Sequence, residues 1–319
     1  MWGEHVHHGL WTSGSETPEE AAVAMARYVA DAAGVSAGSS VVDVGCGYGA
    51  VARLLARERG ASVVGLTLSA AQAAAGQAAS PHGSSPAAGH AASPHGSSPA
   101  PGHAASPHGS SLAAEHAASP QDASPSAATS PRAPFPEAGA SRGAASAPGV
   151  SLLVRDWLAN GLDDAAFDAA IAIESLSHMP DKPRVFAELG RVVRPGGRVV
   201  IVDWLTRESP GPLETRLLLR PICEEGHLPS MHSMGEYAAL LRSSGFAVDR
   251  AEDLTARAAR TWSVVIARLV PLVARDRRLL GALLRSGEAR FGLSLLRIPL
   301  AYRLGSMRLG LLVAQRVRR

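Results

Sequence analysis

Aromatic side chains are scarce in this chain of 319 residues, at 4% of the total, and lysine occurs once, at Lys182. There are two cysteines, Cys46 and Cys223, too few for a disulfide framework. The first residues lack the basic start and apolar run of a secretory signal, so we expect a reduced, cytoplasmic setting. Arginines interrupt every long apolar stretch, so none approaches the roughly 20 residues that span a bilayer. These absences argue against a secreted disulfide scaffold and against an integral membrane protein.

Positive charge is concentrated at the C-terminus. Fourteen arginines lie between Arg257 and Arg319, against only Asp276 and Glu288, while the whole chain has a net charge of +3. Such a tail can attract an anionic lipid surface or nucleic acid. Because the arginines recur among Leu, Val and Ala at helical spacing, the solvated face of packed helices is the favoured interpretation. Weak membrane-surface contact through these helices stays open, and we expect no nucleic-acid partner.

A 13-residue repeat interrupts the chain. AASPHGSSPAAGH begins at Ala78 and returns with small changes at Ala91 and Ala104. Its apolar residues are almost all Ala, and its Ser, Pro and Gly residues break helices and strands, so it cannot build a core. We predict a disordered insertion rich in Ala, Ser, Pro, His and Gly over residues 76–149. Its six histidines could bind a metal, but repeat expansion in a tolerated surface loop is favoured.

Strands and helices alternate in the rest of the chain. Apolar runs predict strands over residues 39–44, 61–68, 150–157, 167–175, 194–204 and 246–254. Helical periodicity predicts helices over residues 50–60, 69–76, 182–193 and 234–246. This order is typical of an α/β fold with a doubly wound, Rossmann-like sheet, in which ligands bind at the carboxyl ends of the strands.

A glycine-rich turn follows the first predicted strand, in the segment VVDVGCGYG from Val41 to Gly49. Glycines at a turn between a strand and a helix let a ligand approach the backbone closely. Their spacing here is G-x-G-x-G, whereas a dinucleotide site has G-x-G-x-x-G. Asp43, just before the first glycine, would repel a pyrophosphate and would suit a ligand that carries an amino group.

The segment from Val41 to Gly49 and four later ones resemble the class I S-adenosylmethionine-dependent methyltransferases. The later segments are GLTLSAAQ at Gly65, RDW at Arg155, IESLSHMPDKP at Ile173 and RVVRPGGRVVIVDW at Arg191. With WGEHVHHGLW at Trp2, they are most similar to the tocopherol- and sterol-type enzymes and related bacterial natural-product methyltransferases. The resemblance covers nearly the whole chain outside the insertion. It implies S-adenosylmethionine as cofactor and a small molecule as methyl acceptor.

The resemblance also implies how the chain is divided. It predicts a lid and first helix in residues 1–33, a cofactor-binding core in 34–75 and 150–254, a helical cap in 255–307 and a final strand in 308–319. The sheet would then have about seven strands, the last of them antiparallel. Family members usually carry a further helix before the WGEHVHHGLW segment, which starts here at Trp2.

Nine residues are assigned to the cofactor by the resemblance: Asp43, Gly45, Gly47, Gly49, Thr67, Leu68, Gln72, Asp156 and Trp157. The glycines would contact the methionine portion, and Asp43 would bind its ammonium group. The Gln72 amide would bind the ribose in place of the usual acidic residue. Asp156 would accept the adenine amino group while Trp157 covers the ring, although Trp157 could instead belong to the core.

Three residues are candidates for proton transfer. His178 and Asp203 lie at the ends of adjacent predicted strands that point at the same crevice, so a histidine oriented by a carboxylate could take a proton from a phenol or sugar hydroxyl. Glu174 is the other candidate, because a carboxylate could stabilise a carbocation and then remove a proton during C-methylation.

The histidine-rich N-terminal segment is predicted to close over the cofactor and the acceptor. Trp2 and Trp11 would supply apolar area, and His5 and His8 would supply hydrogen bonds. We expect no metal here, because the histidines lack a carboxylate or cysteine partner at helical spacing.

The sequence therefore favours in-line methyl transfer to a lipophilic or aromatic small molecule, such as a phenol, a sterol or terpenoid, or a polyketide-like compound. O-, N- and C-methylation all stay open, as does the oligomeric state. Two alternatives remain, an inactive scaffold that binds S-adenosylmethionine and a nucleotide-dependent oxidoreductase, which the glycine spacing disfavours. Nucleic-acid methylation is not expected, because ESLSHMPD stands where an Asn- or Asp-Pro-Pro-aromatic stretch would be needed.

Overall fold

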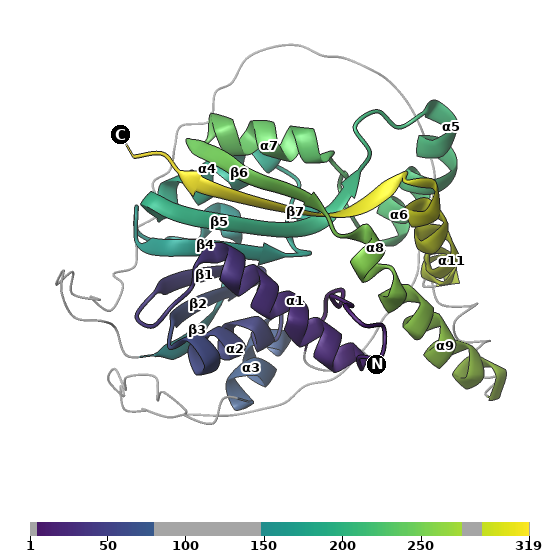
Figure 1. Ribbon diagram of the computed structural model, residues 1–319, viewed down its shortest axis with the longest axis horizontal. Helices are drawn as coiled ribbons and strands as arrows, with labels where there is room; N and C mark the ends of the chain where they lie inside the picture. Colours follow the sequence, from purple (N-terminus) through teal and green to yellow (C-terminus); the bar gives the residue numbers. More distant parts are fainter. Residues whose placement is uncertain (1–4, 80–147, 276–288, 319) are drawn as a thin grey trace, which may run out of the picture. The chain divides into compact units, whose positions relative to one another are not determined.

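A single seven-stranded sheet organises the chain in the computed structural model, which describes residues 5–79, 148–275 and 289–318 (Figure 1). The strand order is β3-β2-β1-β4-β5-β7-β6. Neighbouring strands from β3 to β5 are parallel, and β7 runs antiparallel to both β5 and β6. The strands are β1 (Ser40–Val44), β2 (Ser62–Thr67), β3 (Gly149–Val154), β4 (Phe167–Ile173), β5 (Val193–Thr206), β6 (Phe246–Asp253) and β7 (Met307–Arg316). The predicted Rossmann-like sheet with an antiparallel last strand is confirmed.

Helices cover both faces of this sheet and extend beyond one end of it. The α-helices are α1 (Pro18–Ala33), α2 (Ala50–Arg59), α3 (Ala70–Ala78), α4 (Lys182–Val192), α5 (Pro212–Glu214), α6 (Arg220–Glu225), α7 (Met234–Ser243), α8 (Thr255–Ala258), α9 (Arg260–Arg275) and α11 (Ala289–Leu304). Two short 3-10 turns, η1 (Trp157–Ala159) and η2 (Leu176–His178), follow β3 and β4, and a π-helical segment, η3 (Thr215–Leu219), joins α5 to α6.

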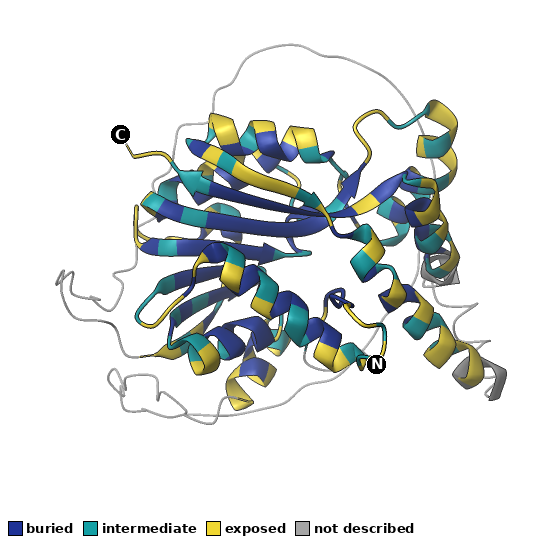
Figure 2. Cartoon of the chain, in the orientation of Figure 1, coloured by how far each residue is buried: buried dark blue, intermediate teal, exposed yellow. Residues whose placement is uncertain are grey.

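The period of two in the strands divides the core into two layers (Figure 2). Val41, Ile171 and Val200 point to the face that is covered by α1, α2 and α3. Their neighbours in the sequence, such as Val42 and Ile201, point to the opposite face, against α4 and α7. Both faces of the central strands are therefore buried, which explains why these strands are apolar throughout.

A third apolar cluster lies beyond the sheet, between η3, α6, α9 and α11. Its buried members are Leu219, Ile222, Trp262, Ile298, Ala301, Tyr302 and Met307. Helices α8, α9 and α11 occur in the region that the sequence assigned to a cap.

The predicted insertion falls mainly on residues outside the described ranges. Helix α3 continues to Ala78 and so includes the first three residues of the predicted insertion, and β3 begins at its last residue, Gly149. Across residues 5–79, 148–275 and 289–318, no helix combines the length and apolarity required to cross a membrane.

Candidate active site

Asp43 lies at the carboxyl end of β1, in the centre of the sheet. Its side chain is 3% exposed, and its Oδ2 atom has no hydrogen-bond partner within the described part of the chain. Burial raises the pKa of this carboxyl from its ordinary value of 3.8 to about 7. A buried acceptor without a donor is costly, so this oxygen marks a place for a ligand that can donate a hydrogen bond.

The three glycines after Asp43 have different surroundings. A Cβ atom on Gly45 would lie 2.4 Å from the Cβ of Ser175, and one on Gly49 would lie 2.8 Å from a methyl carbon of Leu152. A Cβ on Gly47 would meet nothing within 4 Å, and the φ of Gly47 is +54°. Gly45 and Gly49 thus allow close packing, whereas Gly47 opens the turn toward a ligand.

A cavity lies between this turn, the end of β4 and the N-terminal segment. It brings together the predicted residues Asp43, Gly45, Gly47 and His5. Its full lining is His5, Val6, His7, Asp43, Gly45, Cys46, Gly47, Tyr48, Ala50, Val51 and Ile173. Gly49, Thr67, Leu68, Gln72 and Asp156 do not line it.

The residues predicted to hold the ribose lie at the end of β2. Thr67 Oγ1 donates to the carbonyl oxygen Oε1 of Gln72 at 3.0 Å, and accepts from the backbone N–H of Ser69 at 3.2 Å. Leu68 is 76% exposed although it is apolar. Asp156, at the end of β3, is exposed and accepts from the backbone N–H of Leu158 at 2.9 Å.

Trp157 lies in the core, so it leaves no free ring face for an adenine. It is 3% exposed, and its indole N–H donates to the backbone carbonyl of Val185 at 3.1 Å. The indole packs between the sheet and α4, in the second apolar layer. The sequence left two interpretations of Trp157, a cover over the adenine ring or a part of the core, and the structure shows that it is part of the core.

The predicted pairing of His178 with Asp203 is wrong. Asp203 is fully buried; its Oδ2 accepts from the hydroxyl of Tyr237 at 3.0 Å and its Oδ1 from the N–H of Trp204 at 2.9 Å. Burial raises the pKa of Asp203 to about 6. His178 is exposed in the η2 turn and interacts with the backbone of His227, and its pKa is lowered mainly by partial burial.

The carboxylate that does pair with a histidine is Glu174. Its Oε1 accepts from the backbone N–H of His8 at 2.6 Å, and its Oε2 contacts the Nδ1 of His8 at 2.8 Å. The indole N–H of Trp204 also donates to Oε2, at 2.9 Å. Burial alone would raise the pKa of Glu174, but the charge and hydrogen bonds of His8 outweigh it, and the pKa lies below its ordinary value. The sequence predicted His8 and Glu174 as site residues but not their contact, and it did not predict Trp204 beside Glu174 or Tyr302 beside His8.

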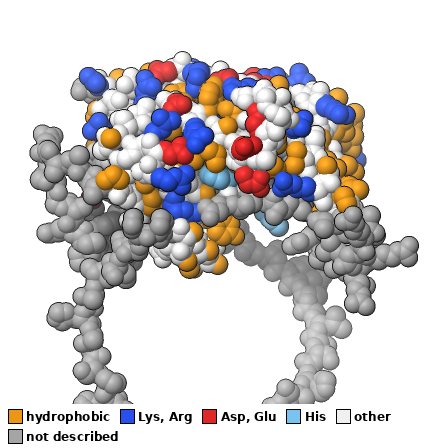
Figure 3. Space-filling view, turned by 60° about the horizontal axis from the view of Figure 1, so that its bottom comes forward, with side chains coloured by type: hydrophobic (Ala, Val, Ile, Leu, Met, Phe, Trp, Pro, Cys, Tyr) orange, Lys and Arg blue, Asp and Glu red, His pale blue; other side chains and the backbone are white. Residues whose placement is uncertain are grey.

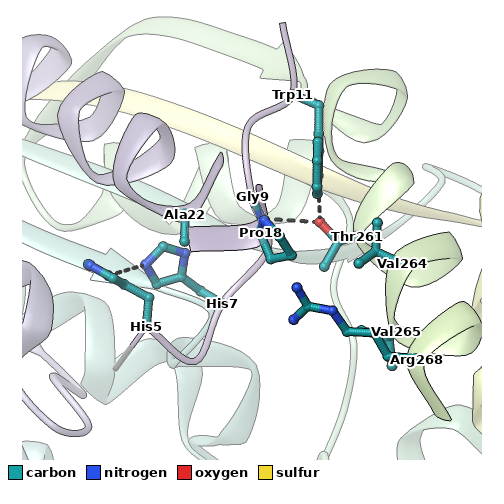
Figure 4. A pocket seen from close by; sticks show the side chains of 10 residues that line it. All are labelled: His5, His7, Gly9, Trp11, Pro18, Ala22, Thr261, Val264, Val265 and Arg268. Carbon is teal, nitrogen blue, oxygen red and sulfur yellow. Dashed lines mark hydrogen bonds between the residues drawn. The ribbon is translucent and has the colours of Figure 1, made fainter. Parts of the chain in front are cut away.

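The segment His5–Trp11, here called the lid strap, is fixed to α1 and to the cap. Figure 4 shows Trp11 and Gly9 both directed at Thr261 of α9, whose hydroxyl accepts from the indole N–H at 2.9 Å and from the backbone N–H of Gly9 at 3.1 Å. His5 and His7 lie side by side, with 3.2 Å between Nδ1 and Nε2. Trp2 lies outside the described residues.

Within the described ranges, no three His, Cys, Asp or Glu side chains lie close enough together to hold one metal ion. The histidines of the repeat lie outside those ranges.

The family model described as a methyltransferase domain matches residues 19–251 of the chain. The chain belongs to this methyltransferase family. The match includes Asp43, the glycine turn and Glu174, and it decides against the oxidoreductase alternative.

The curated relatives of this chain are named as methyltransferases of small molecules. A probable chloroplastic tocopherol O-methyltransferase of Oryza sativa subsp. japonica is 30% identical over 83% of this chain and 60% of that protein. The chain thus spans less than two thirds of that relative. The 27-O-demethylrifamycin SV methyltransferase of Amycolatopsis mediterranei is 27% identical over 82% of this chain and 74% of its own length.

Solved structures share the fold of the methyltransferase. Geranyl diphosphate C-methyltransferase from Streptomyces coelicolor A3(2), solved with S-adenosyl-L-homocysteine, superposes with a TM-score of 0.61 at 20% identity, over 98% of this chain and 90% of that one. The cyclopropane synthase MmaA2 from Mycobacterium tuberculosis has a TM-score of 0.65 at 17% identity, over 97% of this chain and 89% of that one.

The buried carboxyl of Asp43 predicts how the stability of this methyltransferase depends on pH. The unfolded carboxyl loses its proton near pH 3.8 and the folded one near 7. Between these values only the unfolded state has released the proton, so the stability of the wild type falls as pH rises. The side chain introduced by Asp43→Asn does not titrate. The free energy of unfolding of this variant should therefore rise relative to that of the wild type by on the order of 4 kcal/mol between pH 4 and 7, and the difference should then stay constant.

Urea unfolding of both proteins at several pH values checks this difference. The contribution of Asp203 is common to both proteins and cancels. A difference in the free energy of unfolding that stays constant from pH 4 to 8 would contradict the account of Asp43.

Proposed function

We propose that this chain transfers the methyl group of S-adenosylmethionine to a lipophilic or aromatic small molecule. The observation that carries the proposal is the unpartnered Oδ2 of buried Asp43, beside a glycine turn that is open at Gly47. An ammonium group is the donor that this oxygen lacks, and S-adenosylmethionine carries one. Tight backbone approach and a buried acceptor both fit the methionine portion of this cofactor.

The remaining cofactor residues are proposed from their places at the sheet edge. Thr67 holds the carbonyl end of the Gln72 amide, so the NH2 end is offered to the ribose oxygens. The exposed side chain of Leu68 would cover one face of the adenine, and Asp156 would accept its amino group. Trp157 has no part in this site.

Methyl transfer is proposed to occur at the carboxyl ends of β4 and β5. When bound, the cofactor supplies an electrophilic methyl group for in-line displacement. The chain contributes orientation, which is worth roughly 7–11 kcal/mol when the reacting atoms are held in near-attack geometry. We place Glu174 next to the reacting groups and keep His178 as an acceptor-side residue. Asp203 would act indirectly, by holding Tyr237.

The acceptor class follows from the cap and from the relatives. The apolar cluster between η3, α6, α9 and α11 includes Trp262, Tyr302 and Ile222, which suits a flat or lipophilic molecule. The curated relatives are named for tocopherol and rifamycin, which fit this class.

Calorimetric titration with S-adenosylhomocysteine tests the proposal. The wild type should bind, and Asp43→Asn should bind at least tenfold more weakly, because an amide cannot neutralise the ammonium group. The wild-type affinity should also fall as pH drops below about 7, since Asp43 must lose its proton to bind the ligand. Asp249→Asn, which changes an exposed aspartate of β6, is the matched control and should behave as the wild type.

Two results of this titration would count against the proposal. One is full affinity in Asp43→Asn, and the other is no binding by folded wild-type protein. Binding without any methyl transfer would instead favour the inactive scaffold.

A weak contact with anionic membranes is a second proposal, since a lipophilic acceptor dissolves in lipid. Figure 3 shows hydrophobic side chains gathered at the right-hand side, where Figure 1 places α5, α9 and α11. Leu296, Leu300 and Leu304 form a leucine stripe along α11 and are 66%, 46% and 59% exposed. Two arginines are also exposed, Arg303 in α11 and Arg216 in η3.

Vesicle sedimentation tests this contact. The protein should sediment with vesicles that contain phosphatidylglycerol and not with pure phosphatidylcholine, and salt should release it. Leu296→Ser with Leu300→Ser should reduce the bound fraction several-fold, because these side chains would enter the interface. Equal binding of the double variant and the wild type would refute the role of the leucine stripe.

A further inference from the structure

The imidazole of His8 is buried at the centre of the Glu174 site. It is 1% exposed, and both its backbone N–H and its Nδ1 contact Glu174, at 2.6 and 2.8 Å. A residue of the lid strap is thereby tied to the carboxyl end of β4, 166 positions away in the sequence. This double contact fixes both the position of the strap and the orientation of the ring.

The contact with Glu174 also sets which nitrogen of His8 can accept a proton. An ionised carboxylate only accepts, and Glu174 already accepts from the backbone N–H of His8 and from the indole N–H of Trp204, so the Nδ1 atom of His8 beside it carries a hydrogen. In the neutral imidazole, the other nitrogen, Nε2, then has a free electron pair. It lies 3.3 Å from the hydroxyl of Tyr302, which is the position where a hydroxyl group can meet this base.

Aromatic rings surround the imidazole on several sides. The ring centres of Trp262, Trp204 and Tyr302 lie 5.5, 5.8 and 6.0 Å from that of His8. The face of an aromatic ring attracts a cation, and Glu174 supplies the countercharge. The imidazolium that forms when His8 takes a proton is therefore stabilised by its neighbours.

His8 is also next to the cofactor cavity. Its neighbour His7 and the residue before Glu174, Ile173, both line the cavity that contains Asp43 and Gly47. The base thus lies at the end of the site where β4 and β5 finish, beside the place proposed for the cofactor.

We propose that His8 is the catalytic base, that Glu174 is its positioning residue, and that the acceptor is a hydroxyl compound such as a phenol or an enol. The proposal rests on the proposed methyltransferase activity. The acceptor hydroxyl replaces that of Tyr302 at Nε2 and gives its proton to His8. Its oxygen forms the new O–CH3 bond as the S–CH3 bond breaks, with the electron pair of that bond left on sulfur. His8 finally releases the proton to solvent.

Among the described residues, the titratable groups that face His8 are Glu174 from the end of β4, Tyr302 from α11 and His7 from the lid strap, and each can be replaced separately. His178 is the rival base, because it is exposed after the same strand, but no carboxylate of the described residues pairs with it, and Asp203 is held by Tyr237 instead.

Methyl transfer to phenols of graded acidity tests the assignment. The probes are substituted phenols and hydroquinones, from weakly acidic ones to nitrophenols that are already ionised at the assay pH. His8→Asn should lower kcat for the weakly acidic phenols by roughly 10²- to 10⁴-fold and have little effect on the ionised ones, which need no base. Glu174→Gln should lower kcat in the same graded way with less change in KM, because it acts through the orientation of His8.

S-adenosylhomocysteine affinity and thermal unfolding are measured on every variant, so that lost folding or cofactor binding is recognised, and His8→Gln provides a second substitution. Asp249→Asn should match the wild type. A loss in His8→Asn that is the same for ionised and protonated phenols would overturn the proposal, because it indicates a structural role. So would a graded loss in His178→Asn but not in His8→Asn.

The acceptor class is tested in the same assay. A wild-type protein that binds S-adenosylhomocysteine but methylates no hydroxyl compound in the panel would overturn this inference. Failure to bind S-adenosylhomocysteine would instead overturn the proposed function.

Discussion

The carboxylate of Asp43 is the constraint on which the cofactor side of the structure depends. It is buried at the end of β1 with an oxygen that no described group satisfies. Such an arrangement costs stability in the free protein. In the proposed function, a ligand that brings an ammonium group recovers this cost on binding. The instability that Asp43 causes and its proposed affinity for the cofactor then have the same cause.

A second constraint joins the two ends of the chain. Glu174 has a φ of +51°, a conformation that is rare for a residue other than glycine, and its side chain holds His8. Trp204 completes the contact from β5, and Thr261 of α9 fixes the strap next to it. The lid strap and the sheet thereby meet at one carboxylate, and Thr261 and Tyr302 join α9 and α11 to the strap. In the proposed function, this common point allows one side chain to order the acceptor side of the site.

Local patterns in the sequence were sufficient to predict the strands of the sheet and the glycine turn, because both depend on neighbours along the chain. The burial of both faces of β1, β4 and β5 follows from their nearly continuous apolar runs, and Asp43 stands two residues before the first glycine. The proposed acceptor side of the site depends on the face of the sheet to which each residue of β5 points. Asp203 points toward α7, where Tyr237 holds it, and the next residue, Trp204, points to the opposite face with Glu174. The alternation itself follows from the strand, but the partners Tyr237 and Glu174 and the contact of His8 with Glu174 could not be derived from spacing, and the burial of Trp157 likewise follows from long-range packing.

A crystal structure with S-adenosylhomocysteine bound would test the central claim most directly. The account predicts the amino group of the ligand within hydrogen-bond distance, about 2.7–3.2 Å, of Asp43 Oδ2, with the backbone at Gly47 against the methionine portion. It also predicts the sulfur atom on the side of the cavity that leads to Glu174 and His8. A ligand whose amino group lies elsewhere, with Asp43 Oδ2 still unpaired, would contradict it.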